Sequence, residues 1–193
     1  MSKMNVQTLF VDKTRCAKTM KAFKLLHFTL IGLGLCITSG LFAPASSQRA
    51  LTALESYWNG SRTDNFTTGT DLSRKSAVDT NYSYLRVEGC AFLKPQPNTV
   101  PLELYWNAQS GDNFSTATGH QDAINAGYTY VRTEGYIYAT QQPGTVPLWL
   151  FWNSQEQDNY VTATQEGADS AYAAGYSYLR VEGYVYPNSN CSK

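Results

Sequence analysis

The chain has 193 residues and a formal net charge of zero, which hides an uneven distribution of charge. Residues 1–45 hold six of the 15 basic residues and one of the 15 acidic ones, so residues 46–193 carry 9 basic and 14 acidic residues. This balance argues against a nucleic-acid partner, which normally leaves a basic footprint. It also argues against binding to anionic lipid.

The first segment, residues 1–45, has the features of a leader. Lysines precede an apolar run at residues 25–43, and small residues follow at the positions that a signal peptidase reads. We therefore predict cleavage before Ser46, with Met20 as an alternative start of the signal peptide. A retained membrane anchor is the alternative, although the run is near the lower limit of about 17 residues for crossing a bilayer and is weakened by its glycines.

A short linker precedes a unit that recurs three times. Its tryptophans and aspartates are spaced by 48 and then 46 residues. A period of this size is typical of a repeated supersecondary unit that buries its apolar face against its neighbours. Three copies favour a closed arrangement with threefold pseudo-symmetry. The predicted segments are a linker at residues 46–53, repeats at 54–100, 101–146 and 147–188, and a tail at 189–193.

Each repeat has the pattern of short strands. In the second repeat, apolar and polar residues alternate at residues 101–107 with the period of a half-buried strand. The segment at residues 119–127 predicts one or two helical turns ended by a glycine. The other predicted segments are a turn at 108–113 and strands at 114–118, 128–134 and 136–138. Four strands per repeat give about twelve strands, so we predict an all-β fold, a β-trefoil, with a three-bladed propeller-like or prism-like arrangement as the alternative.

Two cysteines, Cys90 and Cys191, remain after the leader. A disulfide between them would join the first repeat to the end of the third, and closing a loop of about 100 residues contributes roughly 4–5 kcal/mol in the chain-entropy model. Disulfides persist in oxidising compartments, so the bridge agrees with export. The alternative is two unpaired thiols.

A set of tryptophan, aspartate and asparagine side chains recurs in every repeat. A carboxylate, an amide and a flat aromatic ring near one turn are what a sugar-binding site needs, and we expect the aspartates to lie at exposed turns. Two structural interpretations compete with this one, because Asp and Asn commonly close turns and because strand alternation places Trp106 and Trp152 on the leucine face, in the core. The predicted ligand-binding residues are Trp58, Asp64, Asn65, Trp106, Asp112, Asn113, Trp152, Asp158 and Asn159.

An arginine and a glutamate also recur together, two residues apart on one strand face. They could line a polar groove. We favour instead a structural role, in which each arginine pairs with a glutamate of its own or the next repeat, because an identical pair in three copies suits the joining of symmetry-related units. The predicted structural charge pairs are Arg86 and Glu88, Arg132 and Glu134, and Arg180 and Glu182.

The sequence gives little support for catalysis. His120 is the only histidine after the leader, and no Cys/His cluster has the spacing of a transition-metal site. No serine lies in a nucleophile-elbow motif. The carboxylates come in equivalent copies, whereas acid–base chemistry needs two groups whose environments separate their pKa values. We therefore expect no enzyme activity, no cofactor and no metal.

The second and third repeats read YWNAQSGDNFSTATGHQDAINAGYTYVRTEGYIY and FWNSQEQDNYVTATQEGADSAYAAGYSYLRVEGYVY. This pattern resembles the aromatic-rich tandem repeats of secreted microbial proteins, which also occur as appendages on secreted hydrolases, in an organisation like that of β-trefoil lectins. The resemblance covers residues 54–188 and implies a repeat signature, since the function of that family is largely unknown. Its usual pattern has histidine after the aspartate. Asn65, Asn113 and Asn159 stand there in this chain, so no role of that histidine is inherited.

These observations predict a secreted, monomeric, lectin-like protein with up to three equivalent shallow sites for glycans or cell-wall polysaccharide. The alternative is an extracellular protein-binding module, such as a protease inhibitor or an adhesin. It would use residues 71–80, which contain Arg74 and Lys75 in the first repeat alone. A hydrolase is the third hypothesis.

Overall fold

The structure is a computed structural model that describes residues 50–191. The predicted leader, its cleavage before Ser46 and the alternative start at Met20 lie outside the described residues, as do the first half of the linker and the last two residues of the tail. No helix in the described part of the chain has the length and apolarity needed to cross a membrane.

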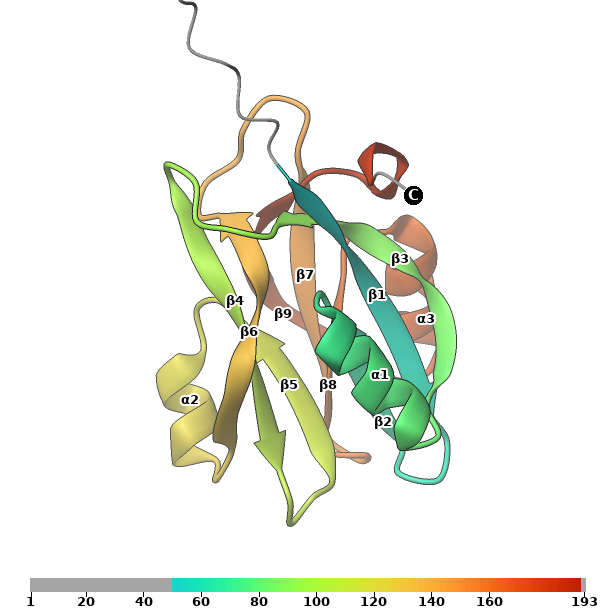
Figure 1. Ribbon diagram of the computed structural model, residues 1–193. Helices are drawn as coiled ribbons and strands as arrows, with labels where there is room; N and C mark the ends of the chain where they lie inside the picture. Colours follow the sequence, from blue (N-terminus) through green and yellow to red (C-terminus); the bar gives the residue numbers. More distant parts are fainter. Residues whose placement is uncertain (1–49, 192–193) are drawn as a thin grey trace, which may run out of the picture. The chain divides into compact units, whose positions relative to one another are not determined.

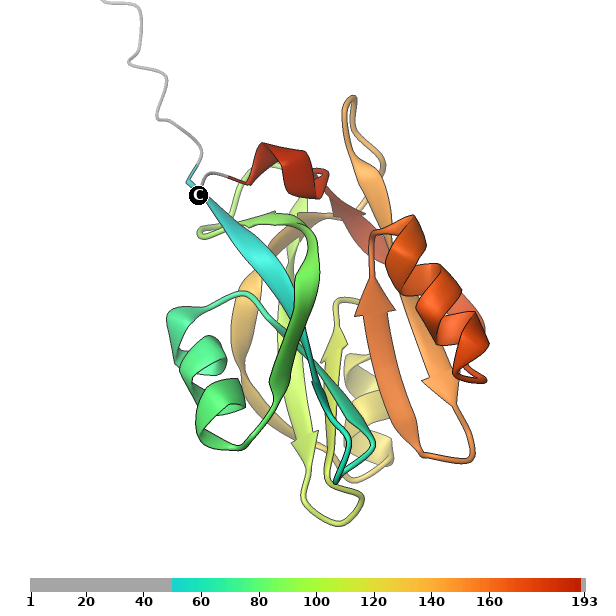
Figure 2. The same ribbon diagram turned by 90° about the vertical axis from the view of Figure 1, so that its right-hand side faces the viewer.

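The three repeats share one order of elements, which is strand, strand, helix, strand (Figure 1). Figures 1 and 2 place the helices on the outside of the strands. A short 3₁₀ helix at Asn188–Asn190 follows the third repeat. The elements are β1 (Leu51–Asn59), β2 (Asp64–Thr68), α1 (Asp71–Asp79), β3 (Ser83–Phe92), β4 (Thr99–Asn107), β5 (Asp112–Thr116), α2 (His120–Asn125), β6 (Thr129–Tyr138), β7 (Val146–Asn153), β8 (Asp158–Thr162), α3 (Gln165–Ala173) and β9 (Ser177–Val185).

The predicted helical turns are present, and local signals explain their ends. Thr70 and Thr164 cap the N-termini of α1 and α3, each with a side-chain oxygen that accepts a backbone N–H bond. Gly119 precedes α2 and provides no side-chain cap, and α2 has 6 residues where α1 and α3 have 9. Gly127 and Gly175 follow α2 and α3 with a φ of 85°, the left-handed conformation in which glycine commonly ends helices.

The strands form one nine-stranded antiparallel sheet. In every repeat the first strand pairs with the other two. Neighbouring repeats meet through their third strands, with Phe92 opposite Tyr136 and Tyr138 opposite Tyr184. An isolated bridge between Cys90 and Tyr186 adds the equivalent contact between the third and first repeats.

The fold is mostly β, as predicted, but the prediction of four strands per repeat is wrong for the described residues. The predicted strands at 128–134 and 136–138 are one strand, β6, which runs through Gly135. A Cβ at Gly135 would lie 2.9 Å from the Cβ of Ala91, so this glycine lets a neighbouring strand approach and does not end its own strand. The structure therefore shows no β-trefoil of twelve strands.

The core lies between the repeats and uses equivalent positions of each. At one level, the rings of Phe92, Tyr138 and Tyr186 contact one another edge to face, with centroids 5.2, 5.8 and 6.1 Å apart. Such aromatic pairs contribute about 0.5–1.5 kcal/mol each beyond their buried area. An apolar layer of fully buried side chains comprises Leu54, Leu102, Leu148, Ala91, Ile137 and Val185.

A buried glutamate joins each repeat to the helix of its neighbour. Glu134 of the second repeat has 0% exposure and accepts hydrogen bonds from the backbone N–H groups of Gly69 and Thr70, at 2.7 and 3.0 Å, just before α1. In the same way, Glu182 binds the segment before α2, and Glu88 binds that before α3. The three contacts form a cycle around the three repeats.

The predicted charge pairs are present in two of the repeats. Arg86 lies 3.4 Å from Glu88, and Arg180 lies 2.8 Å from Glu182. The second repeat differs, because Arg132 donates to the Ser73 hydroxyl at 2.7 Å and forms no ion pair among the described residues. The structural role predicted for the glutamates is thus confirmed, and the Arg132–Glu134 ion pair is wrong.

The predicted disulfide between Cys90 and Cys191 is confirmed. The two residues are 101 positions apart in sequence, and their Cα atoms lie 5.4 Å apart. The backbone of Cys90 also exchanges hydrogen bonds with Tyr186 at 2.8 and 3.1 Å. The bridge therefore fastens the C-terminal segment to the first repeat at a place where strand contacts already bring them together.

We expect Glu134→Ala to lower the free energy of unfolding by about 3 kcal/mol, because it leaves buried N–H and hydroxyl donors without an acceptor. Urea unfolding followed by circular dichroism measures the change. Glu156→Ala, at an exposed position, is the matched control and should change stability by less than about 0.5 kcal/mol. Equal stabilities of the two variants would show that the buried glutamate does not join the repeats.

Reduction of the disulfide should lower the free energy of unfolding by about 2–4 kcal/mol, because the reduced unfolded chain regains the entropy of an open loop. Urea unfolding with and without dithiothreitol tests this, with mass spectrometry to count free thiols. Superimposed curves from fully oxidised and fully reduced protein would contradict a stabilising bridge.

Candidate functional site

The three aspartates that were predicted to lie at exposed turns are buried. Asp64, Asp112 and Asp158 begin β2, β5 and β8, and their exposed fractions are only 1 to 2%. Their carboxylate oxygens lie within 4.8 Å of one another. The expectation of exposure is therefore wrong, and these side chains form one carboxylate trio between the repeats.

Each carboxylate of the trio is bound by two repeats at once. Asp64 accepts hydrogen bonds from the backbone N–H and the side-chain amide of Asn113 in the second repeat, at 2.9 and 2.8 Å. It also accepts from the Tyr82 hydroxyl of its own repeat. Asn159 and Tyr128 bind Asp112 in the same way, and Asn65 and Tyr176 bind Asp158. The network closes into a cycle.

Burial and the neighbouring negative charge raise the pKa values of two of these carboxyl groups, those of Asp64 and Asp158. Burial, and next the charge of Asp112, raise the pKa of Asp64 to about 7 and that of Asp158 to about 10. Burial, followed by the charge of the carboxylate to which each tyrosine donates, raises the pKa values of Tyr82, Tyr128 and Tyr176. Asp158 therefore retains its proton at neutral pH and Asp64 is partly protonated there, while the tyrosines act as hydrogen-bond donors.

The trio is the one group of acidic, histidine or cysteine side chains in residues 50–191 whose ligand atoms are close enough to hold a metal ion. Both oxygens of every carboxylate, however, already accept hydrogen bonds from the chain itself. We assign no metal to it.

Three clefts lie beside this network, one at each junction between repeats. The first–second cleft has a volume of about 320 Å³, the second–third cleft about 240 Å³ and the third–first cleft about 150 Å³. In each, one repeat supplies a tryptophan, an asparagine and an arginine from equivalent positions. These are Trp106, Asn113 and Arg132 in the first–second cleft, Trp152, Asn159 and Arg180 in the second–third, and Trp58, Asn65 and Arg86 in the third–first.

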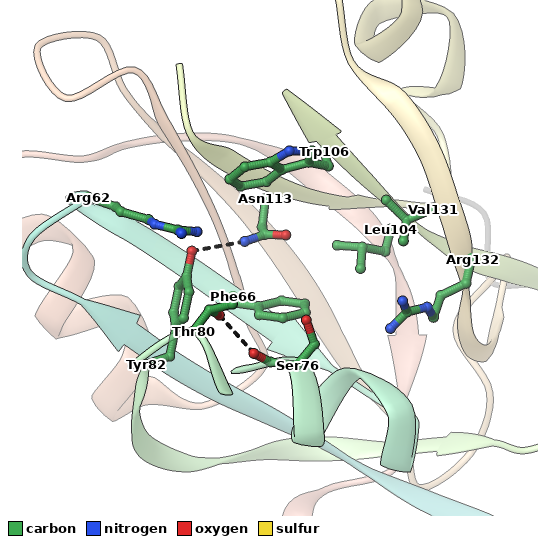
Figure 3. A pocket seen from close by; sticks show the side chains of 10 residues that line it. All are labelled: Arg62, Phe66, Ser76, Thr80, Tyr82, Leu104, Trp106, Asn113, Val131 and Arg132. Carbon is green, nitrogen blue, oxygen red and sulfur yellow. Dashed lines mark hydrogen bonds between the residues drawn. The ribbon is translucent and has the colours of Figure 1, made fainter. Parts of the chain in front are cut away.

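The preceding repeat supplies the opposite wall of each cleft. In the first–second cleft this wall contains Phe66 and Tyr82, together with residues of the α1 segment. Figure 3 shows the rings of Trp106 and Phe66 on opposite sides of the cleft. The amide nitrogen of Asn113 donates to the Tyr82 hydroxyl at 3.1 Å, and its oxygen points the other way (Figure 3). A carbonyl acceptor and aromatic faces therefore meet in one hollow.

The tryptophans line clefts and are not core residues. Trp58, Trp106 and Trp152 are partly exposed, contrary to the placement that alternation predicts for the last two. The reason is a register shift between Leu104 and Tyr105, which buries both of these side chains and turns Trp106 outward. The first and third repeats carry an equivalent shift.

Sequence reasoning did not select two groups of cleft residues as site residues. The arginines were assigned to charge pairs in preference to a polar groove, and Tyr82, Tyr128 and Tyr176 were not selected. Their recurrence at one position in every repeat was the available signal. The asparagines that were selected do line the clefts, while their N–H groups bind the carboxylate trio.

The fold and the clefts thus define a β-rich protein of three equivalent repeats with a potential binding hollow at each junction. Residues 53–186 match the family described as "Domain of unknown function (DUF5648)", and the chain belongs to this family. No curated protein and no solved structure matches the chain.

The raised pKa of Asp64 gives a pH dependence with a definite sign. Between about pH 4 and pH 7 the folded protein holds a proton that the unfolded chain has released, so stability from this group is complete at low pH and falls as the pH rises. The slope is at most about 1.4 kcal/mol per pH unit for each proton. Asp158 extends the fall towards about pH 10.

Unfolding free energies of the wild type and of Asp64→Asn, measured from pH 4 to pH 8, test this dependence. We expect the variant to show a shallower fall with pH, whereas the exposed control Asp169→Asn should follow the wild type. Carboxyl ¹³C titration of the wild type checks the pKa values directly. Parallel curves for all three proteins would contradict proton retention, and a curve that EDTA alters would indicate a bound cation.

Proposed function

We propose that the protein is a secreted carbohydrate-binding protein whose sites are the three clefts between repeats. The observation that carries the proposal is the recurrence of the same tryptophan, asparagine and arginine in every cleft. The hydrogen bonds that join the repeats account for the aspartates and glutamates, which are buried. It does not account for indole rings left partly exposed beside hollows.

The chemistry of each cleft suits a sugar ring. An indole face packs against C–H groups, while an amide oxygen accepts from hydroxyl groups and a guanidinium donates to ring or hydroxyl oxygens. The predicted ligand role of the tryptophans and asparagines is retained in this proposal. The predicted direct role of Asp64, Asp112 and Asp158 is not, because hydrogen bonds inside the protein engage their carboxylates.

The clefts favour binding over hydrolysis. Glycoside hydrolysis usually needs a pair of carboxyl groups that flank the scissile bond. Asp122 is the one carboxylate that lines any of the three clefts in the described residues. The disulfide supports secretion, since such bridges persist in oxidising compartments.

The alternative of a protein-binding module loses its main feature in the structure. Arg74, which distinguishes the first repeat, lies 3.2 Å from Glu55 and 2.9 Å from Asp71, and it donates to the Ala53 carbonyl at 2.6 Å. Lys75 pairs with Asp79 at 2.6 Å. The contacts of Arg74 with Glu55 and Ala53 attach α1 to β1 and engage its guanidinium within the protein, whereas the Lys75–Asp79 pair lies within α1 and is exposed.

Three shallow sites would act together. A single site of millimolar affinity corresponds to only about −4 kcal/mol. Engagement of several sites by one polysaccharide could raise the overall affinity by roughly 10²–10⁴.

A glycan array followed by titration calorimetry tests the proposal. We expect Trp58→Ala, Trp106→Ala and Trp152→Ala each to remove one site, so the stoichiometry falls by one third while the protein stays folded. Tyr130→Ala truncates an aromatic residue that is 51% exposed and lines none of these clefts, and it should leave stoichiometry unchanged. Folded protein that binds no glycan on the array would refute the proposal.

A further inference from the structure

The three clefts differ in charge, and we propose that the first–second cleft selects a sugar that carries a carboxylate, such as a uronic acid. The inference rests on the proposed function and adds a ligand class to one of its sites. Two guanidinium groups, those of Arg62 and Arg132, line this cleft. Figure 3 shows them entering it from opposite sides.

Arg62 is peculiar to this cleft. Its guanidinium carbon lies 5.6 Å from the centre of the Trp106 ring and 5.8 Å from that of Tyr82, so cation–π contacts with both repeats hold the charge at the cleft. The corresponding positions in the second and third repeats are Ser110 and Glu156. No equivalent cation can therefore enter the other two clefts from this turn.

Arg132 forms no direct ion pair among the described residues, unlike its counterparts, and the Ser73 hydroxyl lies between it and Glu134. Arg86 is neutralised by Glu88 and Glu166, at 3.4 and 3.6 Å. Arg180 forms ion pairs with Glu182 and Asp122, at 2.8 and 3.8 Å. Arg132 instead donates to the Ser73 hydroxyl, and among the described residues neither it nor Arg62 forms a salt bridge.

The residues that the helices contribute also differ in charge between the clefts. Ser76 of α1 lines it, whereas Asp122 of α2 lines the second–third cleft. The first–second cleft thus contains two cations and no carboxylate in its lining. The guanidinium groups of Arg62 and Arg132, which have no carboxylate partner among the described residues, match a planar carboxylate. Arginine can bind such a group with two parallel hydrogen bonds.

The ligand is an acidic unit of a short or mostly neutral chain. Residues 46–193 carry 14 acidic and 9 basic residues, so a long polyanion would be repelled outside the cleft. In the view of Figure 3 the aromatic rings of Trp106 and Phe66 lie between the two cations, and they provide the faces that a sugar ring needs. A small anion uses only the guanidinium groups, whereas a uronic acid also uses the rings.

Titration calorimetry with uronic acid trisaccharides and their neutral counterparts tests the inference on the full chain. We expect the wild type to bind one equivalent of the acidic trisaccharide at least tenfold more tightly than the neutral one. Arg62→Gln should weaken acidic binding about tenfold and leave neutral binding nearly unchanged, whereas Arg132→Gln should weaken the binding of both sugars and that of the acidic one more strongly. Lys75→Gln, which removes an exposed cation outside the clefts, is the matched control.

A gain-of-function variant keeps the test decisive. Ser110→Arg places the missing cation at the second–third cleft and should add preference for the acidic trisaccharide there. Equal affinity for acidic and neutral sugars, or acidic binding that survives both arginine changes, would overturn the inference and leave the proposed function intact. Competition by inorganic sulfate or acetate as effective as that by the trisaccharide would overturn the inference alone, whereas failure of folded protein to bind any sugar tested would overturn both.

Discussion

Buried carboxylates that accept hydrogen bonds across repeat boundaries are the interaction on which this structure depends. A carboxylate removed from water is costly unless donors surround it. Asp64 and Glu134 meet this condition only because a neighbouring repeat supplies the N–H groups. In a single repeat, both carboxylates would be either exposed to water or buried without these hydrogen-bond donors. The three repeats are therefore stable as a set, and each junction is fixed by polar contacts with defined directions.

The direction of these contacts positions the clefts. Asn113 donates across the junction to Asp64, and this bond holds Trp106, its neighbour on the paired strand, against the first repeat. On the other side of the cleft, Glu134 attaches β6 to the start of α1. These two sets of hydrogen bonds hold the polar side chains beside the junction in place. Those side chains therefore do not fill the space between the two repeats. A hollow with aromatic and polar walls remains.

The sequence predicted the features that local patterns encode and missed those that depend on neighbouring repeats. Three repeats, a mostly β fold, the helical turns and the disulfide all follow from periodicity, alternation, glycine position and cysteine count. Gly135 was taken as the end of a strand, because the strand that packs on it belongs to another repeat. Trp106 was placed in the core, because a bulge cannot be recognised from alternation.

The burial of the aspartates also depends on neighbouring repeats and was missed for that reason. Asp followed by Asn near a glycine-containing segment has the local composition of a turn, and Asp64 does follow one. Its burial comes from Asn113 and Asp158, which are distant in sequence. The recurring tyrosine that donates to each aspartate was the one pattern from which a buried network could have been proposed.

Residues that are identical in all three repeats and residues that differ between them have separate roles in this chain. The residues that join the repeats, such as Asp64, Glu134 and their counterparts, are identical in all three copies, because a change in one would leave donors of its neighbour unpaired. Arg62 lies at a cleft margin, in a turn that contributes no such contact, and the other copies differ there. Divergence at the margins can therefore alter the charge of one cleft without disturbing the frame that all three share. The repeat architecture thus allows three clefts built from equivalent residues to differ in charge.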